Sequence, residues 1–334
     1  MTIIANVKDE KGNPIKLELK QPAFLVGNGI NLADGCEELR WDKLLVKVLF
    51  GEDKDKNEKS KDVLEEEFKG LNYPEIAELA EWYRKNGTTE KDIKIDQNKT
   101  IKNQICDNLD DKGNKTHKQF IDFCMENDIP VLTTNFDQKL LSSLKTKKKE
   151  KVKTPFWFLT DTEKNNYRKI PYHYPFRAYF AEKEFDDNDE INKKFAVWYI
   201  HGTKRYVDSI RLNNVDYARN IAEIDKLIRY KKQIGTNWIE KHSWIDIFMR
   251  NDLVIMGLGL DSSETDIRWL LRERYVYQKS MNQRENSSVS TIYIYDPKDG
   301  IAPGKRKLFE ALGIKCVEMK QNEIYSLDKY LSTK

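Results

Sequence analysis

The sequence predicts an α/β protein, in which a doubly wound parallel sheet carries a helical lobe. Short apolar runs alternate with segments of helical periodicity along most of the 334 residues, an order that is typical of a parallel sheet covered on both faces. Aliphatic, aromatic, Met and Cys residues make up 39% of the chain, which is enough apolar material for a buried core. We therefore expect one large domain with an attached lobe.

Six apolar runs are expected to form the strands, and they cover residues 23–27, 129–133, 196–200, 253–257, 291–295 and 314–317. Helical spacing predicts helices over 36–50, 137–144, 215–232, 238–249, 264–277 and 305–312, and a short helix at the chain end. Residues 51–61 (GEDKDKNEKSK) begin with glycine and contain no large apolar side chain, so we expect a solvated loop there.

Two segments interrupt this alternation. Helical periods without a convincing strand predict a helical lobe over about 60–127, inserted into a core sheet of about 20–50, 128–146 and 196–334. An irregular aromatic insertion over about 150–195 is expected to pack against the main body, because its rings are not interleaved with basic residues as in a base-stacking surface. The basic run 145–153 (KTKKKEKVK) predicts an exposed loop, with a phosphate-contacting patch as the alternative.

Charge and cysteine content exclude several classes of protein. The 58 basic and 55 acidic residues nearly cancel, which argues against a polyanion-binding groove over the whole surface. No apolar stretch reaches the roughly 18 residues of a membrane-spanning helix, and the N-terminus lacks the apolar region of a secretion signal. Four scattered cysteines (Cys36, Cys106, Cys124 and Cys316) fit a cytoplasmic protein with neither a disulfide framework nor a zinc site.

Polar or glycine-rich residues follow the first two predicted strands. In the run from Gly27 through Asn28 and Gly29 to Asn31, the glycines would let the backbone approach a pyrophosphate. The full GxGxxG spacing is absent, however, and a tight turn without a ligand would have the same sequence. The second run, TTNFD, includes Asn135 and Asp137, and ordinary helix capping is its alternative interpretation.

The next two strand ends add a histidine and a second glycine turn. His201 follows the third strand, where it is suited to act as a general base, although a satisfied structural histidine is the commoner explanation for a lone His. Gly257, Gly259, Leu260 and Asp261 follow the fourth strand and could equally form a tight turn. Because the carboxyl ends of parallel strands meet at one edge of a sheet, we expect all four strand ends to converge on one crevice.

In this order, the motifs GNGIN, RWDKLL, TTNFD, YIHG and GLGLDSSETDIRWLL resemble those of the sirtuin-like domain. They are most similar to its zinc-free branch in bacterial anti-phage effectors, including the Thoeris type. The resemblance extends from about residue 24 to 295, with long unmatched stretches between the motifs. It implies a Rossmann-like NAD-binding sheet with a helical second lobe, and cleavage of the bond between nicotinamide and ribose. NAD would be the substrate, and no metal is implied.

The resemblance also implies roles for single residues. Asn135 matches the asparagine that orients the nicotinamide ribose or the attacking water, and His201 matches the catalytic histidine. Asp137 matches the acidic residue of the same motif as Asn135. Gly27 and Gly29 match the glycines that face the phosphates.

The remaining matches concern cofactor binding and include three departures. Gly257 with Leu260 matches the later turn near the adenosine half, and Asp261 follows in that turn. Asn28 and Asn31 stand where the family more often has Ala and Ser, and Gly259 stands where Ser is usual. Each change keeps the residue small or polar, so nucleotide binding remains the expectation while the phosphate contacts become uncertain.

Three functions follow as alternatives. The first is an NAD hydrolase that releases nicotinamide and ADP-ribose and depletes NAD in anti-phage defence by abortive infection. The second is a sirtuin-type protein deacylase, which the missing cysteine pairs of the zinc module disfavour. The third is a catalytically silent NAD-binding regulatory subunit. Control is expected from homo-oligomerisation or from a partner protein such as an ATPase, a nucleotidase or a phage-sensing component, at the surfaces formed by 63–123 and 154–195.

Overall fold

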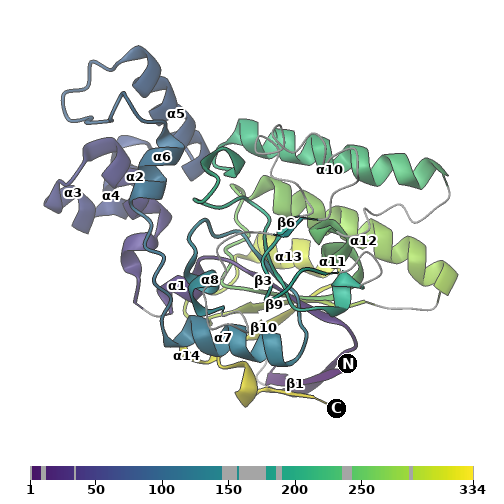
Figure 1. Ribbon diagram of the computed structural model, residues 1–334. Helices are drawn as coiled ribbons and strands as arrows, with labels where there is room; N and C mark the ends of the chain where they lie inside the picture. Colours follow the sequence, from purple (N-terminus) through teal and green to yellow (C-terminus); the bar gives the residue numbers. More distant parts are fainter. Residues whose placement is uncertain are drawn as a thin grey trace.

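The fold centres on one mostly parallel sheet with helices on both faces (Figure 1). The computed structural model describes residues 2–8, 13–33, 35–144, 156–157, 178–185, 190–234, 243–285 and 289–333. In these ranges the sheet has nine strands in the order β11-β1-β10-β9-β8-β3-β4-β7, and β2 pairs with β1 outside this path. The predicted α/β class, with a Rossmann-like parallel sheet, is confirmed.

All six predicted strands are present and parallel to one another: β3 (Pro22–Val26), β4 (Val131–Thr133), β7 (Val197–Tyr199), β8 (Asp252–Met256), β9 (Thr291–Tyr295) and β10 (Ile314–Glu318). From β3 the chain moves outward to β4 and β7, then returns to β8 on the other side of β3. The strand order therefore reverses between β3 and β8, the position at which doubly wound sheets bind their ligands. Val26 is in register with both Thr133 and Met256, so the three central strands end at the same level.

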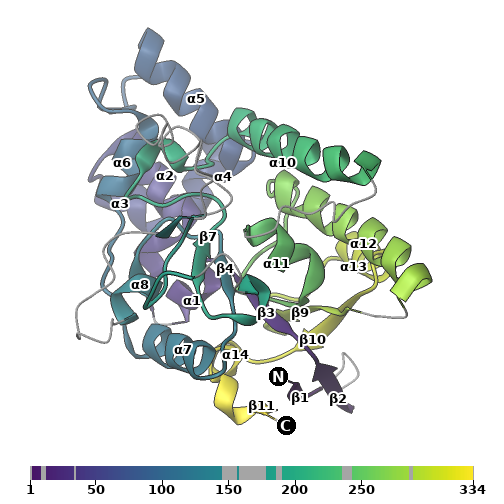
Figure 2. The same cartoon turned by 45° about the vertical axis from the view of Figure 1, so that its right-hand side comes forward.

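The parallel strands alternate their side chains between two apolar layers. Phe24 and Val26 of β3 face one layer, whereas Ala23 and Leu25 face the other. The first layer contains α7 (Lys115–Glu126), α8 (Lys139–Ser143) and α14 (Gln321–Ile324), as Figure 2 shows. The second contains α10 (Asn214–Ile234), α11 (Trp244–Arg250), α12 (Thr265–Glu285) and α13 (Pro303–Ala311). Within the described ranges, no helix combines the length and apolarity needed to cross a membrane.

The predicted helical lobe lies to one side of the sheet (Figure 1). It has its own apolar core and consists of α2 (Trp41–Phe50), α3 (Lys54–Glu58), α4 (Ser60–Glu67), α5 (Tyr73–Asn86) and α6 (Ile101–Asp107). Its boundaries differ from the prediction, because α2 packs with the lobe and α7 packs on the sheet. The loop predicted over 51–61 is wrong: Asp53 caps α3 by accepting a hydrogen bond from the Lys56 N–H, and this solvated helix needs no buried face.

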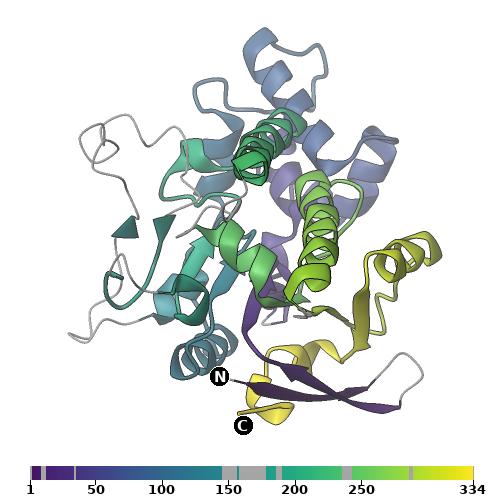
Figure 3. The same ribbon diagram turned by 90° about the vertical axis from the view of Figure 1, so that its right-hand side faces the viewer.

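The two ends of the chain add an antiparallel edge that the sequence did not predict. β1 (Ile3–Lys8) pairs with β2 (Pro14–Leu19) on one side and with β11 (Leu331–Thr333) on the other. The short helix predicted at the chain end exists as α14, but the chain continues into β11, so its two ends meet in the sheet (Figure 3). The β1–β11 pairing in this edge joins Ile3 to Thr333, which no local pattern encodes.

The aromatic insertion is described only in part. β5 (Phe156–Trp157) pairs with β6 (Ala178–Tyr179), and the Tyr179 ring stacks on Phe185 with a centroid distance of 4.7 Å. Tyr179 also lies against Trp198 of the main sheet, so the predicted packing on the main body is confirmed for this portion. The basic run 145–153 and residues 158–177 and 186–189 of the insertion lie outside the described residues.

The turns that follow β3 and β8 touch each other through backbone atoms. The Gly27 N–H donates to the Met256 carbonyl at 3.0 Å, and the Gly29 N–H donates to the Gly257 carbonyl at 2.8 Å. A methyl group on Gly257, whose φ is +63°, would overlap the Tyr325 hydroxyl and approach the Gly29 Cα to 2.9 Å. Glycine is therefore required here for close approach as well as for its backbone conformation.

We predict that Gly257→Ala lowers the free energy of unfolding by about 2–4 kcal/mol, because it combines left-handed backbone strain with steric overlap. Urea denaturation followed by circular dichroism measures this change. Gly304→Ala is the matched control, since a methyl group there meets open space in the first turn of α13, and it should raise stability by up to about 1 kcal/mol. Equal stabilities for the two variants would contradict the close-approach argument.

Candidate functional site

A pocket of about 180 Å³ opens where the strand order reverses, between the carboxyl edge of the sheet and the helical lobe. Its sheet side is mainly polar and comes from the loops after β3, β4, β7 and β8. Its lobe side is mainly apolar. The lining residues are Asn28, Leu39, Trp41, Leu44, Tyr73, Pro74, Leu109, Thr134, Asn135, Phe136, Asp137, His201, Leu212, Tyr217, Gly257, Leu258, Gly259, Asp261, Ser263 and Glu264.

The loop after β4 holds Asn135 in a fixed position. The Thr133 hydroxyl donates to the Val26 carbonyl at 2.9 Å and accepts from the Asn135 N–H at 3.1 Å. The Asn135 Nδ2 donates to the Gly27 carbonyl at 3.3 Å, which ties the side chain to the end of β3. Among the described residues nothing donates to its Oδ1, so this oxygen can accept a hydrogen bond from water or a ligand hydroxyl.

His201 is oriented by a buried carboxylate. Its Nε2 lies 3.0 Å from the Asp266 Oδ2, and that oxygen also accepts from the Asn220 Nδ2 at 2.8 Å. The Ile267 N–H donates to the other carboxylate oxygen at 2.9 Å. Burial by itself would raise the pKa of Asp266, but the His201 ring and these hydrogen bonds lower it below the usual value.

The pairing with an ionised Asp266 assigns the tautomer of His201. Nε2 carries the proton and donates a hydrogen bond to Asp266. The neutral ring therefore has its lone pair on Nδ1. In the described part of the chain, no residue forms a hydrogen bond with Nδ1. This arrangement is that of a general base: the carboxylate stabilises the imidazolium formed when Nδ1 takes up a proton.

Glu264 is a second carboxyl group beside His201, and its pKa is shifted in the opposite direction to that of Asp266. It lines the pocket, and the Leu260 N–H forms a hydrogen bond with its carboxyl group. Its Oε2 is buried and has no hydrogen-bond partner in the described ranges. Burial raises the pKa of Glu264 to about 7, against the attraction of His201. Glu264 therefore titrates near neutral pH.

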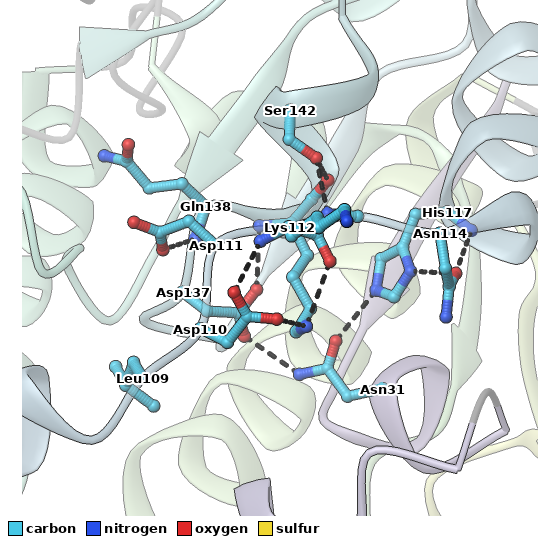
Figure 4. A network of polar contacts seen from close by, with 12 residues as sticks. Asn31, Leu109, Asp110, Asp111, Lys112, Asn114, His117, Asp137, Gln138 and Ser142 are labelled. Carbon is cyan, nitrogen blue, oxygen red and sulfur yellow. Dashed lines mark hydrogen bonds and ion pairs between the residues drawn. The ribbon is translucent and has the colours of Figure 1, made fainter.

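A buried polar network supports the pocket from behind (Figure 4). The Asn31 Nδ2 donates to the Asp137 Oδ2 at 2.9 Å and to the Asn28 Oδ1 at 2.7 Å. Its Oδ1 lies 2.8 Å from the His117 Nε2, whose ring also contacts Asn114 at 2.7 Å. Because both Asn31 amide hydrogens are engaged, its oxygen must accept the His117 proton. Asn31 thus joins the loops after β3 and β4 to α7.

Asp137 combines burial with several hydrogen bonds. Its Oδ1 accepts from the Lys139 N–H at 2.9 Å, and its Oδ2 accepts from Asn31. Burial dominates over these contacts and over the nearby Lys139 charge, so the pKa of Asp137 is raised. The Lys139 Nζ lies 2.8 Å from the Asp110 Oδ2, so this lysine is paired away from the pocket.

Aromatic side chains form the other side of the pocket. Trp41 opens α2 and meets Phe136 edge to face, with ring centroids 5.5 Å apart. Tyr73 is the first residue of α5, where a capping box between Asn72 and Glu75 fixes the start of the helix. Tyr217 of α10 lies 5.5 Å from the His201 ring. The pocket can thus receive a flat ring on one side and hydroxyl groups on the other.

The structure brings most of the predicted site residues together. Those that line the pocket are Asn28, Asn135, Asp137, His201, Gly257, Gly259 and Asp261, whereas Gly27, Gly29, Asn31 and Leu260 are not among its lining residues. The N–H groups of Gly27 and Gly29 donate to the carbonyls of Met256 in β8 and Gly257 in the following turn. Their proposed role toward phosphates stays a prediction.

Several residues of the site escaped the sequence analysis. Glu264 and Asp266 stand within the motif GLGLDSSETDIRWLL, but the resemblance assigned neither of them a role. Tyr73 and Tyr217 reach the pocket from helices, and no local signal marks them; Trp41 stands in the motif RWDKLL, but no role in the site was assigned to it. In the described part of the chain no group of three or more His, Cys, Asp or Glu residues is arranged to hold a metal ion.

No family model matches the chain, and no curated protein matches it either.

We predict that Asn31→Ala lowers the free energy of unfolding by about 2–4 kcal/mol, because it removes hydrogen bonds to the buried His117 and Asp137 side chains and to Asn28. Thermal and urea denaturation measure the loss. Asn127→Ala, which removes one side-chain contact at the end of α7, serves as the control and should cost at most about 1 kcal/mol. A loss for Asn31→Ala no larger than this would show that the network is not a connecting element.

We further predict that Glu264→Gln stabilises the protein at pH 8 by up to about 3 kcal/mol and has little effect near pH 4.5. The pKa of Glu264 is about 7 in the folded protein, against the usual value of 4.5 that applies to the unfolded chain. The folded state therefore binds the Glu264 proton more tightly than the unfolded state does. Its contribution to stability is complete below pH 4.5 and is lost as the pH rises to 7. Unfolding curves of both proteins across this range test the sign, and a difference independent of pH would refute it.

Proposed function

We propose that this protein hydrolyses NAD at the bond between nicotinamide and ribose, giving nicotinamide and ADP-ribose. One observation carries the proposal: Asn135 and His201, the two residues expected to be catalytic, line the same pocket at the reversal of strand order. The resemblance of the motifs to zinc-free sirtuin-like domains supports the same reaction. Glycine turns from β3 and β8 border the pocket, as a dinucleotide site in a doubly wound sheet requires.

The reaction suits these side chains. Nicotinamide leaves from a pyridinium as a neutral molecule, so the N-glycosidic bond breaks with its electron pair on the ring nitrogen and needs little acid assistance. The ribose passes through an oxocarbenium-like transition state, as in glycoside hydrolysis. Water then bonds to the anomeric carbon and gives one proton to a base. The site must therefore hold ribose and water and accept a proton.

Asn135 and His201 divide these tasks. The Oδ1 of Asn135 is positioned to accept a hydrogen bond from the attacking water or from a ribose hydroxyl, while its Nδ2 stays anchored on Gly27. His201 takes the proton of the water on Nδ1, and Asp266 stabilises the imidazolium that results. The aromatic side formed by Trp41, Phe136 and Tyr73 suits the nicotinamide ring.

In the cell, we propose that this activity depletes NAD as an effector of anti-phage defence by abortive infection. The proposal at this level rests on the motif resemblance. Constitutive NAD hydrolysis would be toxic, so the activity is held off until a homo-oligomer forms or a partner protein binds. The deacylase alternative predicts O-acyl-ADP-ribose from an acylated peptide, and the silent-subunit alternative predicts NAD binding without nicotinamide release.

We predict that Asn135→Ala and His201→Ala each reduce nicotinamide release by at least about 100-fold, because each removes a group needed in the transition state. Purified protein is incubated with NAD, alone and with the products of neighbouring genes, and nicotinamide is measured by chromatography. Asn127→Ala, at the end of α7 and outside both candidate contact surfaces, is the matched control and should keep full activity.

Circular dichroism and thermal unfolding establish that each variant is folded. Turnover retained by both the Asn135 and the His201 variant would overturn the assignment of the catalytic pair. Failure of the wild-type protein to release nicotinamide under every activating condition would overturn the proposed function itself.

A further inference from the structure

Glu264 has a buried oxygen for which the described residues provide no partner. The carboxyl group accepts a hydrogen bond from the Leu260 N–H, whereas no described residue donates one to Oε2. An unsatisfied buried carboxylate oxygen is unfavourable, and a hydrogen-bond donor on a ligand would remove that cost. Glu264 also lines the pocket, so a ligand bound there lies beside this carboxyl group.

The charges around Glu264 limit what the donor can be. The titratable groups that act on it or feel its charge are His201, Asp261, Asp266, Tyr217 and Tyr293. With two further carboxylates in this set, a phosphate group next to Glu264 would be repelled. A neutral hydroxyl avoids that repulsion and donates to the carboxylate, and carboxylates recognise ribose hydroxyls in other dinucleotide sites for this reason.

The neighbours also indicate which ribose is concerned. Glu264 interacts electrostatically with His201, the proposed base, and both residues line the pocket together with Asn135. We propose that Glu264 binds a hydroxyl group of the ribose that carries nicotinamide, accepting its hydrogen bond on Oε2. This inference rests on the proposed function for the identity of the substrate, but it concerns binding and does not require turnover.

The contact makes nucleotide binding depend on pH. The ionised carboxylate accepts a hydrogen bond more strongly than the protonated form does, so affinity should rise as Glu264 loses its proton. Since the pKa of Glu264 is about 7, the change falls between pH 6 and 8. Replacement by glutamine keeps the size of the side chain and removes both the charge and its titration.

The test measures binding of two ligands by isothermal titration calorimetry, because neither is consumed. ADP-ribose contains the second ribose, and ADP lacks it. At pH 8, Glu264→Gln should weaken ADP-ribose binding about tenfold and leave ADP binding unchanged. The wild-type affinity for ADP-ribose should fall severalfold from pH 8 to pH 6, and that of the variant should stay level. Glu273→Gln, within α12 and not among the residues that line the pocket, is the control and should resemble wild type.

Each other outcome counts against the proposal. Equal ADP-ribose affinity in wild type and Glu264→Gln overturns it, as does an equal loss for ADP and ADP-ribose, which would indicate a structural role or the other ribose. Absence of ADP-ribose binding to the wild-type protein overturns it as well. Nicotinamide release by the wild-type protein is measured separately. If nicotinamide is released but Glu264→Gln does not change ADP-ribose binding, the proposed function stands and this inference fails. If Glu264→Gln changes binding as expected but no nicotinamide is released, this inference stands and the proposed function fails.

Discussion

The close contact between the turns after β3 and β8 is the constraint on which the pocket depends. Gly29 donates to the Gly257 carbonyl at 2.8 Å, and neither turn has room for a methyl group. Because β3 and β8 are paired and end at the same level, this contact brings Asn28 next to the loop that carries Glu264. A wider turn on either strand would separate the two halves of the polar side.

The parallel part of the fold could be predicted from the sequence because its information is local. The structure contains all six predicted strands, and β3, β4, β7, β8 and β9 are short, largely apolar runs buried on both faces. The β1–β11 pairing is different, since it joins Ile3 to Thr333 and depends on contacts that form only in the folded chain. The error at α3 has another cause: a helix capped by Asp53 needs no apolar stripe.

The candidate site shows the same difference between features encoded locally and features that depend on tertiary packing. Asn135 and His201 follow buried strands, and the topology rule that places strand ends at one edge was sufficient to bring them together. Trp41 and Tyr73 could not be predicted, because their place in the pocket depends on how the lobe packs on the sheet. Asn31 was predicted among the cofactor-binding residues, and in the structure its buried carboxamide contacts Asp137, Asn28 and His117. An asparagine in a glycine turn looks the same in both roles.

The two carboxyl groups beside His201 differ in pKa because they differ in their hydrogen bonds. Asp266 and Glu264 lie two residues apart at the start of α12, yet Asp266 accepts hydrogen bonds from His201, Asn220 and Ile267 while one Glu264 oxygen accepts none. The pKa of Asp266 is therefore lowered despite its burial, and that of Glu264 is raised to about 7. Asp266 remains an anion that fixes the His201 tautomer. Glu264 keeps a variable charge, so a ligand that donates to it would also complete the electrostatic environment of the base.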